Sequence, residues 1–210
     1  TGSSLGDRLY AYAGSDTVSG GQGADTIVDQ AGSNYLRGDE GDDQITGGSG
    51  FDDINGNMGN DTASGGLGDD WVVGGKDNDR LFGDDGADLV YGNLGDDYCD
   101  GGAGNDTIRG GQQNDSLSGG AGNDFVSGDR GDDTMTGGSG ADLFHSSADA
   151  GVDRVLDFSV SEGDRVMLDP GTTYSVAQVG GDTVITMSAG QVVLVGVSMS
   201  SLLTGSIFVG

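Results

Sequence analysis

A nine-residue unit repeats from Gly2 to His145, and no insertion or deletion breaks its frame. Glycine dominates positions one and four of the sixteen units and occupies position two in half of them. Position eight is apolar throughout, as in GGQGADTIV at 20–28. Glycine costs a helix about 1 kcal/mol per residue relative to alanine, so a helical fold is excluded. Collagen is also excluded, because glycine does not recur at every third residue and the chain contains one proline.

Each unit divides into a minimal strand and a turn. At positions seven to nine the middle side chain points inward, because side chains alternate along a strand. Positions one to six are expected to form the turn, where glycine adopts positive φ values without steric cost. One unit cannot bury its apolar residue alone, so the pattern predicts an all-β solenoid with a thin core. Cys99 falls at position eight and is interpreted as a small buried hydrophobe.

Position six is aspartate in every unit except the fourth, which has Asn34. Stacked at a strand spacing of about 4.8 Å, a column of carboxylates would repel itself strongly. A hard divalent cation between neighbouring carboxylates removes this repulsion, and calcium suits flexible sites built from carboxylates and carbonyls. Zinc is disfavoured, because no histidine or cysteine recurs at the ligand positions.

The chain of 210 residues has 35 acidic and 8 basic residues, a net charge of −27. This charge excludes nucleic acid and anionic membranes as partners and favours metal ions. No apolar run is long enough to span a membrane. The first residue is Thr1 and no signal peptide is visible, so we interpret the chain as a fragment or processed piece of a larger protein.

No catalytic motif is present. The chain lacks HExxH, and its single histidine, His145, is expected to be a capping or surface residue. Neither a catalytic triad nor a zinc–histidine site is therefore expected. The chain is predicted not to be an enzyme, although an upstream domain outside it could be one.

The unit resembles the nonapeptide GGxGxDxUx of the RTX (repeats-in-toxin) proteins, over residues 2–145. The resemblance implies a right-handed parallel β-roll of sixteen nonapeptide repeats, in which two units form one coil. It also implies calcium ions between turns eighteen residues apart, held by position-six carboxylates and by backbone carbonyls of positions one to four. The predicted domains are this calcium-binding roll and a β-rich C-terminal cap, residues 146–210.

The resemblance carries a ligand set onto this sequence. One implied column contains Asp25, Asp43, Asp61, Asp79, Asp97, Asp115 and Asp133, and the other contains Asp52, Asp70, Asp88, Asp106, Asp124 and Asp142. The twelfth and fourteenth units, which match the pattern closely, add carbonyls at Gly101, Gly102, Ala103 and Gly104 and at Gly119, Gly120, Ala121 and Gly122. Eight turns per side leave seven gaps per side, so at most fourteen Ca²⁺ ions fit. We expect absent or weak ions near Leu5, Tyr12 and Asn34 and doubtful ones near Asp77 and Gln113, where the motif is broken.

Positions seven and nine point outward, and the even-numbered units carry a one-sided apolar stripe. It consists of Tyr35, Trp71, Val73, Leu89, Tyr91, Phe125 and Leu143. The plain interpretation is scattered surface aromatics. The alternative is a docking face for the C-terminal segment, a missing N-terminal domain or a second copy of the chain.

Beyond the repeat, residues 151–168 resemble the GxDxIxDFxxGxDxIxL segment that follows RTX repeats in type I-secreted proteases, lipases and alginate epimerases. Its expected role is to cap the open end of the solenoid. Asp153, Asp157 and Asp164 are candidates for one more ion or for turn and cap residues. A hairpin of 174–179 with 183–187, a strand at 191–197 and one helical turn at 198–203 are predicted. The tail 206–210 resembles a C-terminal type I secretion signal.

These patterns predict a secreted bacterial calcium-binding module, extracellular or on the cell surface. It would fold when calcium binds outside the cell and would support type I secretion and stability of a larger exported protein. Calcium ions and the secretion machinery are its expected partners. Two alternatives stay open: a surface-layer or adhesin module that self-assembles through calcium, and a polysaccharide-binding module like those of alginate epimerases, which requires a basic stripe.

Overall fold

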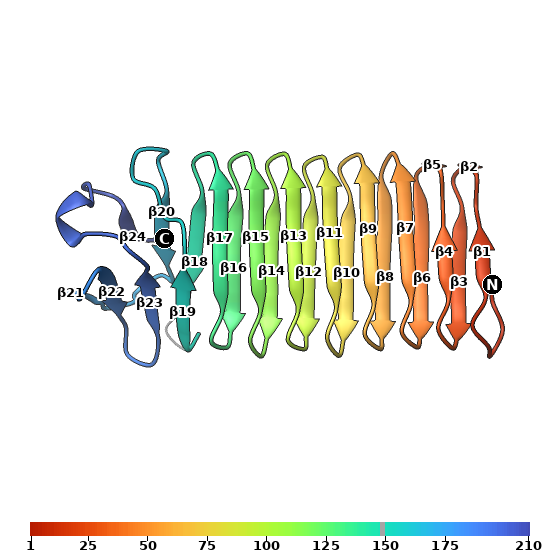
Figure 1. The fold of residues 1–210 in the computed structure, drawn as a ribbon, viewed down its shortest axis with the longest axis horizontal. Helices are drawn as coiled ribbons and strands as arrows, with labels where there is room; N and C mark the ends of the chain where they lie inside the picture. The colour runs from red at the N-terminus through yellow and green to blue at the C-terminus, as the bar shows by residue number, and fades with distance from the viewer. Residues whose placement is uncertain (148–149) are drawn as a thin grey trace.

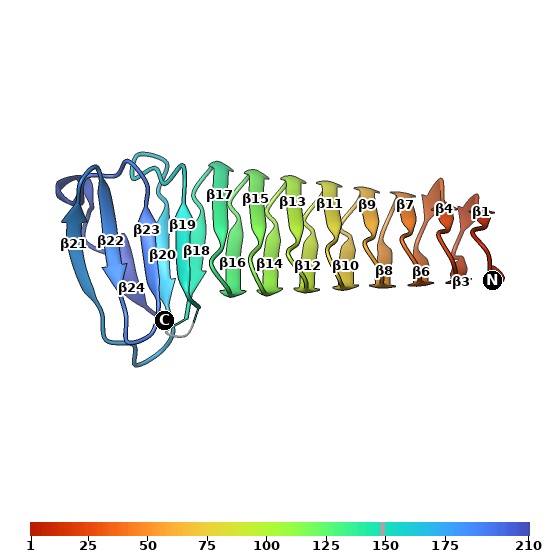
Figure 2. The same ribbon diagram turned by 60° about the horizontal axis from the view of Figure 1, so that its bottom comes forward.

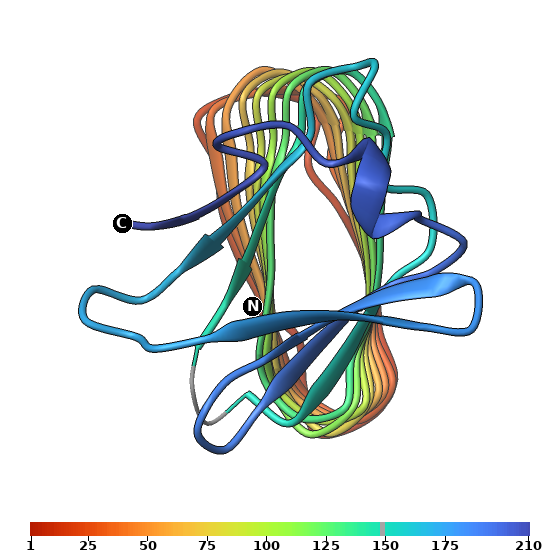
Figure 3. The same ribbon diagram turned by 90° about the vertical axis from the view of Figure 1, so that its left-hand side faces the viewer.

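The computed structural model describes residues 1–147 and 150–210 and shows one elongated coil (Figure 1). Two parallel sheets run along its length and face each other across a narrow core, as the view down the long axis shows (Figure 3). Positions seven to nine of the odd-numbered units lie in one sheet and those of the even-numbered units in the other, so each coil contains two units. The predicted all-β parallel β-roll is confirmed.

The first sheet has twelve strands, in spatial order β1 (Arg8–Tyr10), β4 (Thr26–Val28), β7 (Gln44–Ser49), β9 (Thr62–Leu67), β11 (Arg80–Asp85), β13 (Tyr98–Ala103), β15 (Ser116–Ala121), β17 (Thr134–Ser139), β19 (Val152–Val155), β23 (Gln191–Leu194), β22 (Asp182–Thr186) and β21 (Ser175–Val179). The second has ten, in spatial order β3 (Thr17–Gln22), β6 (Asn34–Glu40), β8 (Asp52–Met58), β10 (Trp71–Lys76), β12 (Leu89–Leu94), β14 (Thr107–Gln112), β16 (Phe125–Arg130), β18 (Leu143–Ser146), β20 (Arg165–Leu168) and β24 (Ile207–Val209). A small separate pair joins β2 (Ala13–Gly14) to β5 (Ala31–Gly32).

Neighbouring strands of the roll pair in parallel with a register of eighteen residues. Ile45 lies beside Ala63 in the first sheet, and Val72 lies beside Val90 in the second. Position-eight side chains therefore stack in two continuous rows. From Ile27 to Phe144 these residues are at most 2% exposed, and Cys99 is fully buried as predicted. Burial also raises the pKa of the Cys99 thiol, which keeps it protonated.

Most strands are twice as long as the sequence predicts. A typical strand such as β9 covers positions seven to nine and then positions one to three of the next unit. The prediction that positions one to six form the turn was therefore wrong in extent, because backbone groups at positions two and three also pair with the next coil. Position one is skipped in the pairing, as Gly47 and Gly65 are between β7 and β9. The turn proper contains positions four to six.

The roll continues past the last repeat. Strands β19 and β20 pair in parallel with β17 and β18, so they form a ninth coil built from the C-terminal segment. The predicted hairpin is confirmed as the antiparallel pair β21 and β22, and β23 pairs antiparallel with β22. These strands extend beyond the end of the coil (Figure 2). The predicted helical turn is a short 3-10 helix at Met199–Ser201.

Strand β24 adds the chain's last apolar residues to the edge of the second sheet, beside β20. Nothing helical in residues 1–147 and 150–210 has the length and hydrophobicity needed to cross a bilayer.

Candidate metal sites

The position-six aspartates form two ladders along the coil. In each ladder, one carboxylate oxygen, Oδ1, accepts a hydrogen bond from the backbone N–H of the aspartate eighteen residues earlier. The N–O distances are 2.7 Å from Asp25 to Asp43, 2.8 Å from Asp61 to Asp79 and 2.8 Å from Asp88 to Asp106. From Asp25 to Asp142 these aspartates are at most 3% exposed. Each turn is therefore tied to the next through a buried carboxylate.

The second oxygen of each carboxylate, Oδ2, has no hydrogen-bond partner. This holds for all thirteen aspartates of the implied ligand set: Asp25, Asp43, Asp52, Asp61, Asp70, Asp79, Asp88, Asp97, Asp106, Asp115, Asp124, Asp133 and Asp142. A buried charge without a partner costs several kcal/mol or more, and native proteins pair such groups or coordinate metals with them. The residues therefore fit the calcium ions that the repeat implies.

Burial raises the pKa of twelve of these carboxyls, from Asp43 to Asp142, and nearby like charges raise it further. The pKa reaches about 8 for Asp79 and Asp115 and about 7 for Asp61 and Asp70. It reaches about 6 for Asp43, Asp52, Asp88, Asp97, Asp106, Asp124 and Asp142. A cation bound to the orphaned oxygens would offset the cost of ionising these buried carboxyls near neutral pH.

Backbone carbonyls supply the remaining oxygen atoms around each carboxylate. At Gly101, a Cβ atom would lie 2.5 Å from Asp106 Oδ2 and 2.6 Å from the carbonyl oxygen of Gly119, so both oxygens line the same small space. The described residues contain no group of three or more His, Cys, Asp or Glu side chains placed to hold a metal ion. A site here must therefore combine carboxylates with carbonyls, which is the ligand chemistry of calcium.

At three ends of the ladders, the last aspartate accepts hydrogen bonds from a serine. At the N-terminal end, Asp7 Oδ2 accepts hydrogen bonds from the N–H and the hydroxyl of Ser3, and these bonds lower the pKa of Asp7. At the C-terminal end, Asp153 accepts the Ser146 hydroxyl at 2.8 Å, and Asp164 Oδ2 accepts the N–H of Ser159 at 2.8 Å. Hydrogen-bond donors thus occupy these terminal carboxylates.

Of the three C-terminal aspartates, Asp153 lies beside Asp133 on the first ladder, whereas burial and the nearby charge of Asp157 both raise the pKa of Asp164. Asp153 continues the first ladder, where Oδ1 faces the N–H of Asp133 at 3.4 Å, and Asp164 continues the second, where it accepts the N–H of Asp142 at 3.0 Å. Asp157 accepts the N–H groups of Gly137 and Gly138 instead. Of the two expectations, the contacts favour turn and cap residues over a further ion site.

A second ladder at position five was missed by the sequence analysis. Position five carries Asp or Asn in nine units, and these side chains accept the N–H of position five in the following coil. Examples are Asn78 N–H to Asn60 at 3.1 Å, Asp96 N–H to Asn78 at 2.9 Å and Asn114 N–H to Asp96 at 2.9 Å. The enrichment at position five was visible in the sequence and could have revealed this ladder.

The turns at Asp77 and Gln113, where calcium binding was expected to be doubtful, share a positive φ with the glycine turns. Their φ angles are +72° and +76°, smaller than the +102° to +154° of the position-four glycines from Gly23 onward. The neighbouring carboxylates, Asp79 and Asp115, keep an orphaned Oδ2. The doubt about these two sites stays a prediction.

The apolar stripe lies on the outer face of the second sheet. Tyr35, Trp71 and Leu89 are 53%, 41% and 38% exposed, and Trp71 and Leu89 are neighbours in register. The C-terminal segment, one of the three predicted occupants, extends the sheet along its edge and leaves these three side chains exposed. A missing domain or a second copy stays a prediction, which replacing Trp71 and Phe125 by serine tests through assembly and melting.

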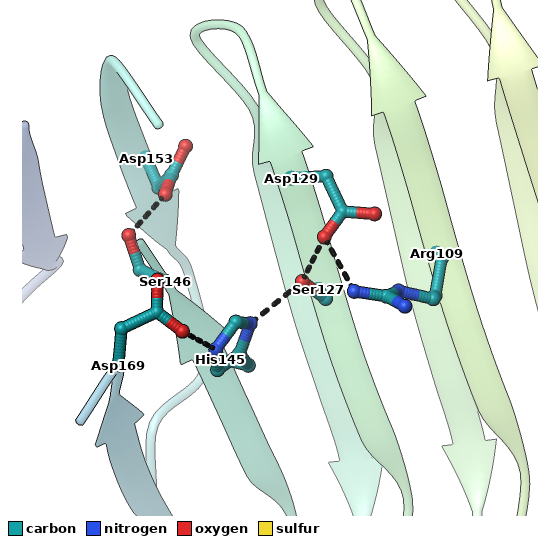
Figure 4. A network of polar contacts seen from close by, with 7 residues as sticks. All are labelled: Arg109, Ser127, Asp129, His145, Ser146, Asp153 and Asp169. Atoms are coloured by element: carbon teal, nitrogen blue, oxygen red, sulfur yellow. Dashed lines mark hydrogen bonds and ion pairs between the residues drawn. The ribbon is translucent and has the colours of Figure 1, made fainter. Parts of the chain in front are cut away.

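His145 lies in a polar network at the end of the repeat (Figure 4). Its Nε2 lies 3.2 Å from Asp169 Oδ1, and its Nδ1 lies 3.0 Å from the hydroxyl oxygen of Ser127. The three residue types of a catalytic triad therefore meet here, contrary to the expectation that none could be assembled. Ser127 is fully buried and donates its hydroxyl proton to Asp129 at 2.9 Å, so it is not placed as a nucleophile.

Comparison with known proteins gives one matching family, described as the RTX calcium-binding nonapeptide repeat (4 copies). It matches residues 1–28, 28–63, 64–99, 73–108, 100–135, 109–144 and 118–153. No curated protein sequence matches the chain.

Two examples illustrate the similar solved structures. One is the extracellular lipase LipA from Serratia marcescens, with 16% identity over 90% of this chain and a TM-score of 0.37. The chain spans 45% of that lipase. The other is the AlgE6R3 subunit of the mannuronan C5-epimerase from Azotobacter vinelandii, with 26% identity over 67% of this chain and 78% of that chain, and a TM-score of 0.25.

Proposed function

Because the chain belongs to the family of RTX calcium-binding nonapeptide repeats, we propose that it is the calcium-triggered folding module of an exported protein. The observation that carries this proposal is the pair of buried ladders, in which thirteen carboxylates each keep one oxygen without a partner. Bound calcium neutralises these oxygens and joins consecutive turns. The chain's own part is to hold the carboxylates and carbonyls in register.

Without calcium, several forces oppose the fold. The net charge of −27 repels itself, and 45 glycines lose more backbone entropy on folding than other residues do. Calcium sites in extracellular modules have a Kd of about 10⁻⁴–10⁻³ M, far above the calcium level of a cytosol. The chain would therefore stay unfolded inside the cell and fold after export, where many bound ions stabilise the native state.

The end of the chain is compatible with this order of events. Ile207, Phe208 and Val209 pair with β20 in the folded state. A type I secretion signal at 206–210 would thus be free to meet the secretion machinery only before this sheet forms. This supports export of the chain before it folds.

A calcium titration followed by far-ultraviolet circular dichroism tests the proposal. We expect a cooperative gain of β-structure at calcium concentrations of about 10⁻⁴–10⁻³ M and none with the same concentrations of magnesium. A chain that is equally folded with and without calcium would refute the proposal.

The exposed apolar stripe favours one second candidate, a surface-layer or adhesin module that self-assembles in calcium. Light scattering with and without calcium separates it from the first. The polysaccharide-binding alternative finds no support in the arginines whose contacts are described. Arg37 and Arg109 lie four strands apart and pair with Asp53 and Asp129, and Arg80 packs on the ring of Tyr98.

A further inference from the structure

The fourth unit departs from the repeat at two positions at once. Asp29 occupies position one, which is glycine in most other units. Asn34 occupies position six, which is aspartate in every other unit. By the motif alone this unit has lost its carboxylate. In the structure, the side chain of Asp29 contacts Asn34 and brings a carboxylate beside position six.

Asn34 brings two carboxylates together. Its side-chain Nδ2 donates to Asp29 Oδ2 at 2.8 Å and to Asp52 Oδ1 at 2.7 Å. These two oxygens therefore lie at most about 5.5 Å apart. Asn34 has no spare polar atom, because its backbone N–H also donates to Asp52 and its Oδ1 accepts the N–H of Asp16.

The other oxygens of both carboxylates are orphaned. Asp29 Oδ1 and Asp52 Oδ2 are buried without a hydrogen-bond partner, and the two residues are 2% and 0% exposed. Asp29 is the one position-one residue in the chain that presents such an oxygen, and its unit is the one without an aspartate at position six. Two buried, adjacent carboxylates with unused oxygens require a cation between them or a proton.

We propose that Asp29 and Asp52 form a divalent-cation site in which position one supplies the carboxylate that position six lacks. The backbone supports it: the carbonyl oxygens of Gln30 and Gly32 face the next turn at Gly48 and Gly50, as those of positions two and four do in other units. Two carboxylates with turn carbonyls are ligands suited to calcium. The inference rests on the proposed calcium-binding function and adds a site where the repeat motif predicts none or a weak one.

Counting bound ions tests this inference. Native mass spectrometry at saturating calcium should find one ion fewer on Asp29→Asn than on the unaltered chain. The asparagine keeps the size of the side chain and an oxygen for Asn34 but loses the charge. The double variant Asp29→Asn with Asn34→Asp returns a carboxylate to position six and should recover the ion. Glu40→Gln, an exposed carboxylate in the next unit, is the matched control and should leave the count unchanged.

The outcomes separate the two proposals. If the unaltered chain binds no calcium, the proposed function fails. If it binds calcium and Asp29→Asn binds the same number of ions, this inference alone is overturned. Should Asp29→Asn fail to fold, a crystal structure of the unaltered calcium-loaded chain decides. Ion density between Asp29 Oδ1 and Asp52 Oδ2 would support the site. Calcium bound in the neighbouring turns, with no ion between these two oxygens, would overturn it.

Discussion

At the scale of single residues, two kinds of glycine must be distinguished. Position-one glycines such as Gly101 have no positive φ, and their lack of a side chain makes room for a carboxylate and a carbonyl. Glycines at positions two and four adopt φ values such as +102° at Gly102 and +146° at Gly104. The first kind is required by ligand geometry and the second by backbone conformation.

Gly101→Ala should weaken calcium binding without introducing backbone strain. The new methyl group would lie within 2.5 Å of Asp106 Oδ2 and must displace it. We expect about a tenfold loss of affinity at this turn, or roughly 1.4 kcal/mol, seen by isothermal titration calorimetry. Gly181→Ala is the control, because nothing lies within 4 Å of its Cβ position. Equal losses of calcium affinity in both variants would show that the space at position one is not needed for calcium binding.

Gln113→Gly should stabilise the calcium-loaded chain. Gln113 has a φ of +76°, which costs a residue with a side chain about 1 kcal/mol that glycine does not lose. We expect a gain in the free energy of unfolding of up to about 1 kcal/mol, measured by urea denaturation at saturating calcium. The neighbouring Gln112→Gly has no such strain to relieve and should destabilise the chain. A loss in both variants would show that the side chain of Gln113 matters more than its backbone.

At the scale of strands and turns, the sequence predicted the fold well where the repeat is intact. Register, the buried position-eight rows and the two columns follow from the period of nine. Strand length did not, because it depends on hydrogen bonds to the next coil. The ninth coil was hidden because the ladder spacing lengthens from eighteen residues to twenty at Asp153 and twenty-two at Asp164. The role of Asp29 could not be predicted from the sequence, because it depends on the contacts that Asn34 makes with both Asp29 and Asp52.

The contacts of His145 join the last repeat strands, β16 and β18, to the end of β20. One ring nitrogen of His145 lies 3.0 Å from the Ser127 hydroxyl oxygen and the other lies 3.2 Å from Asp169 Oδ1, and the tautomer decides which nitrogen donates. We expect His145→Ala to cost about 1 kcal/mol, measured by urea denaturation, because Asp169 is half exposed and its charge is screened. Asp169→Asn should reproduce part of this loss, and unchanged stability in both would contradict the role.

At the scale of the whole molecule, the metal-free chain should respond to pH in the opposite direction from most proteins. Its buried carboxyls have raised pKa values in the folded state, about 6 to 8, against about 3.9 when unfolded. The folded state then binds more protons, so stability is greatest near pH 4 and falls as pH rises to 8. Circular dichroism in a chelator should show more β-structure at pH 4.5 than at pH 8.

Calcium binding should accordingly release protons. Calorimetric titrations at pH 6 in two buffers of different ionisation enthalpy should give different apparent enthalpies, and the difference should shrink above pH 8. Buffer-independent enthalpies at pH 6 would show that the carboxyls are already ionised before calcium arrives.

The serines at the ladder ends affect whether calcium can link one chain to another. A coil whose last carboxylates were left open could share an ion with the end of another coil, and calcium would then link chains head to tail into fibres. Ser3, Ser146 and Ser159 occupy three of those terminal carboxylates with their own hydrogen bonds. These hydrogen bonds should therefore disfavour calcium-linked contacts between chains at Asp7, Asp153 and Asp164.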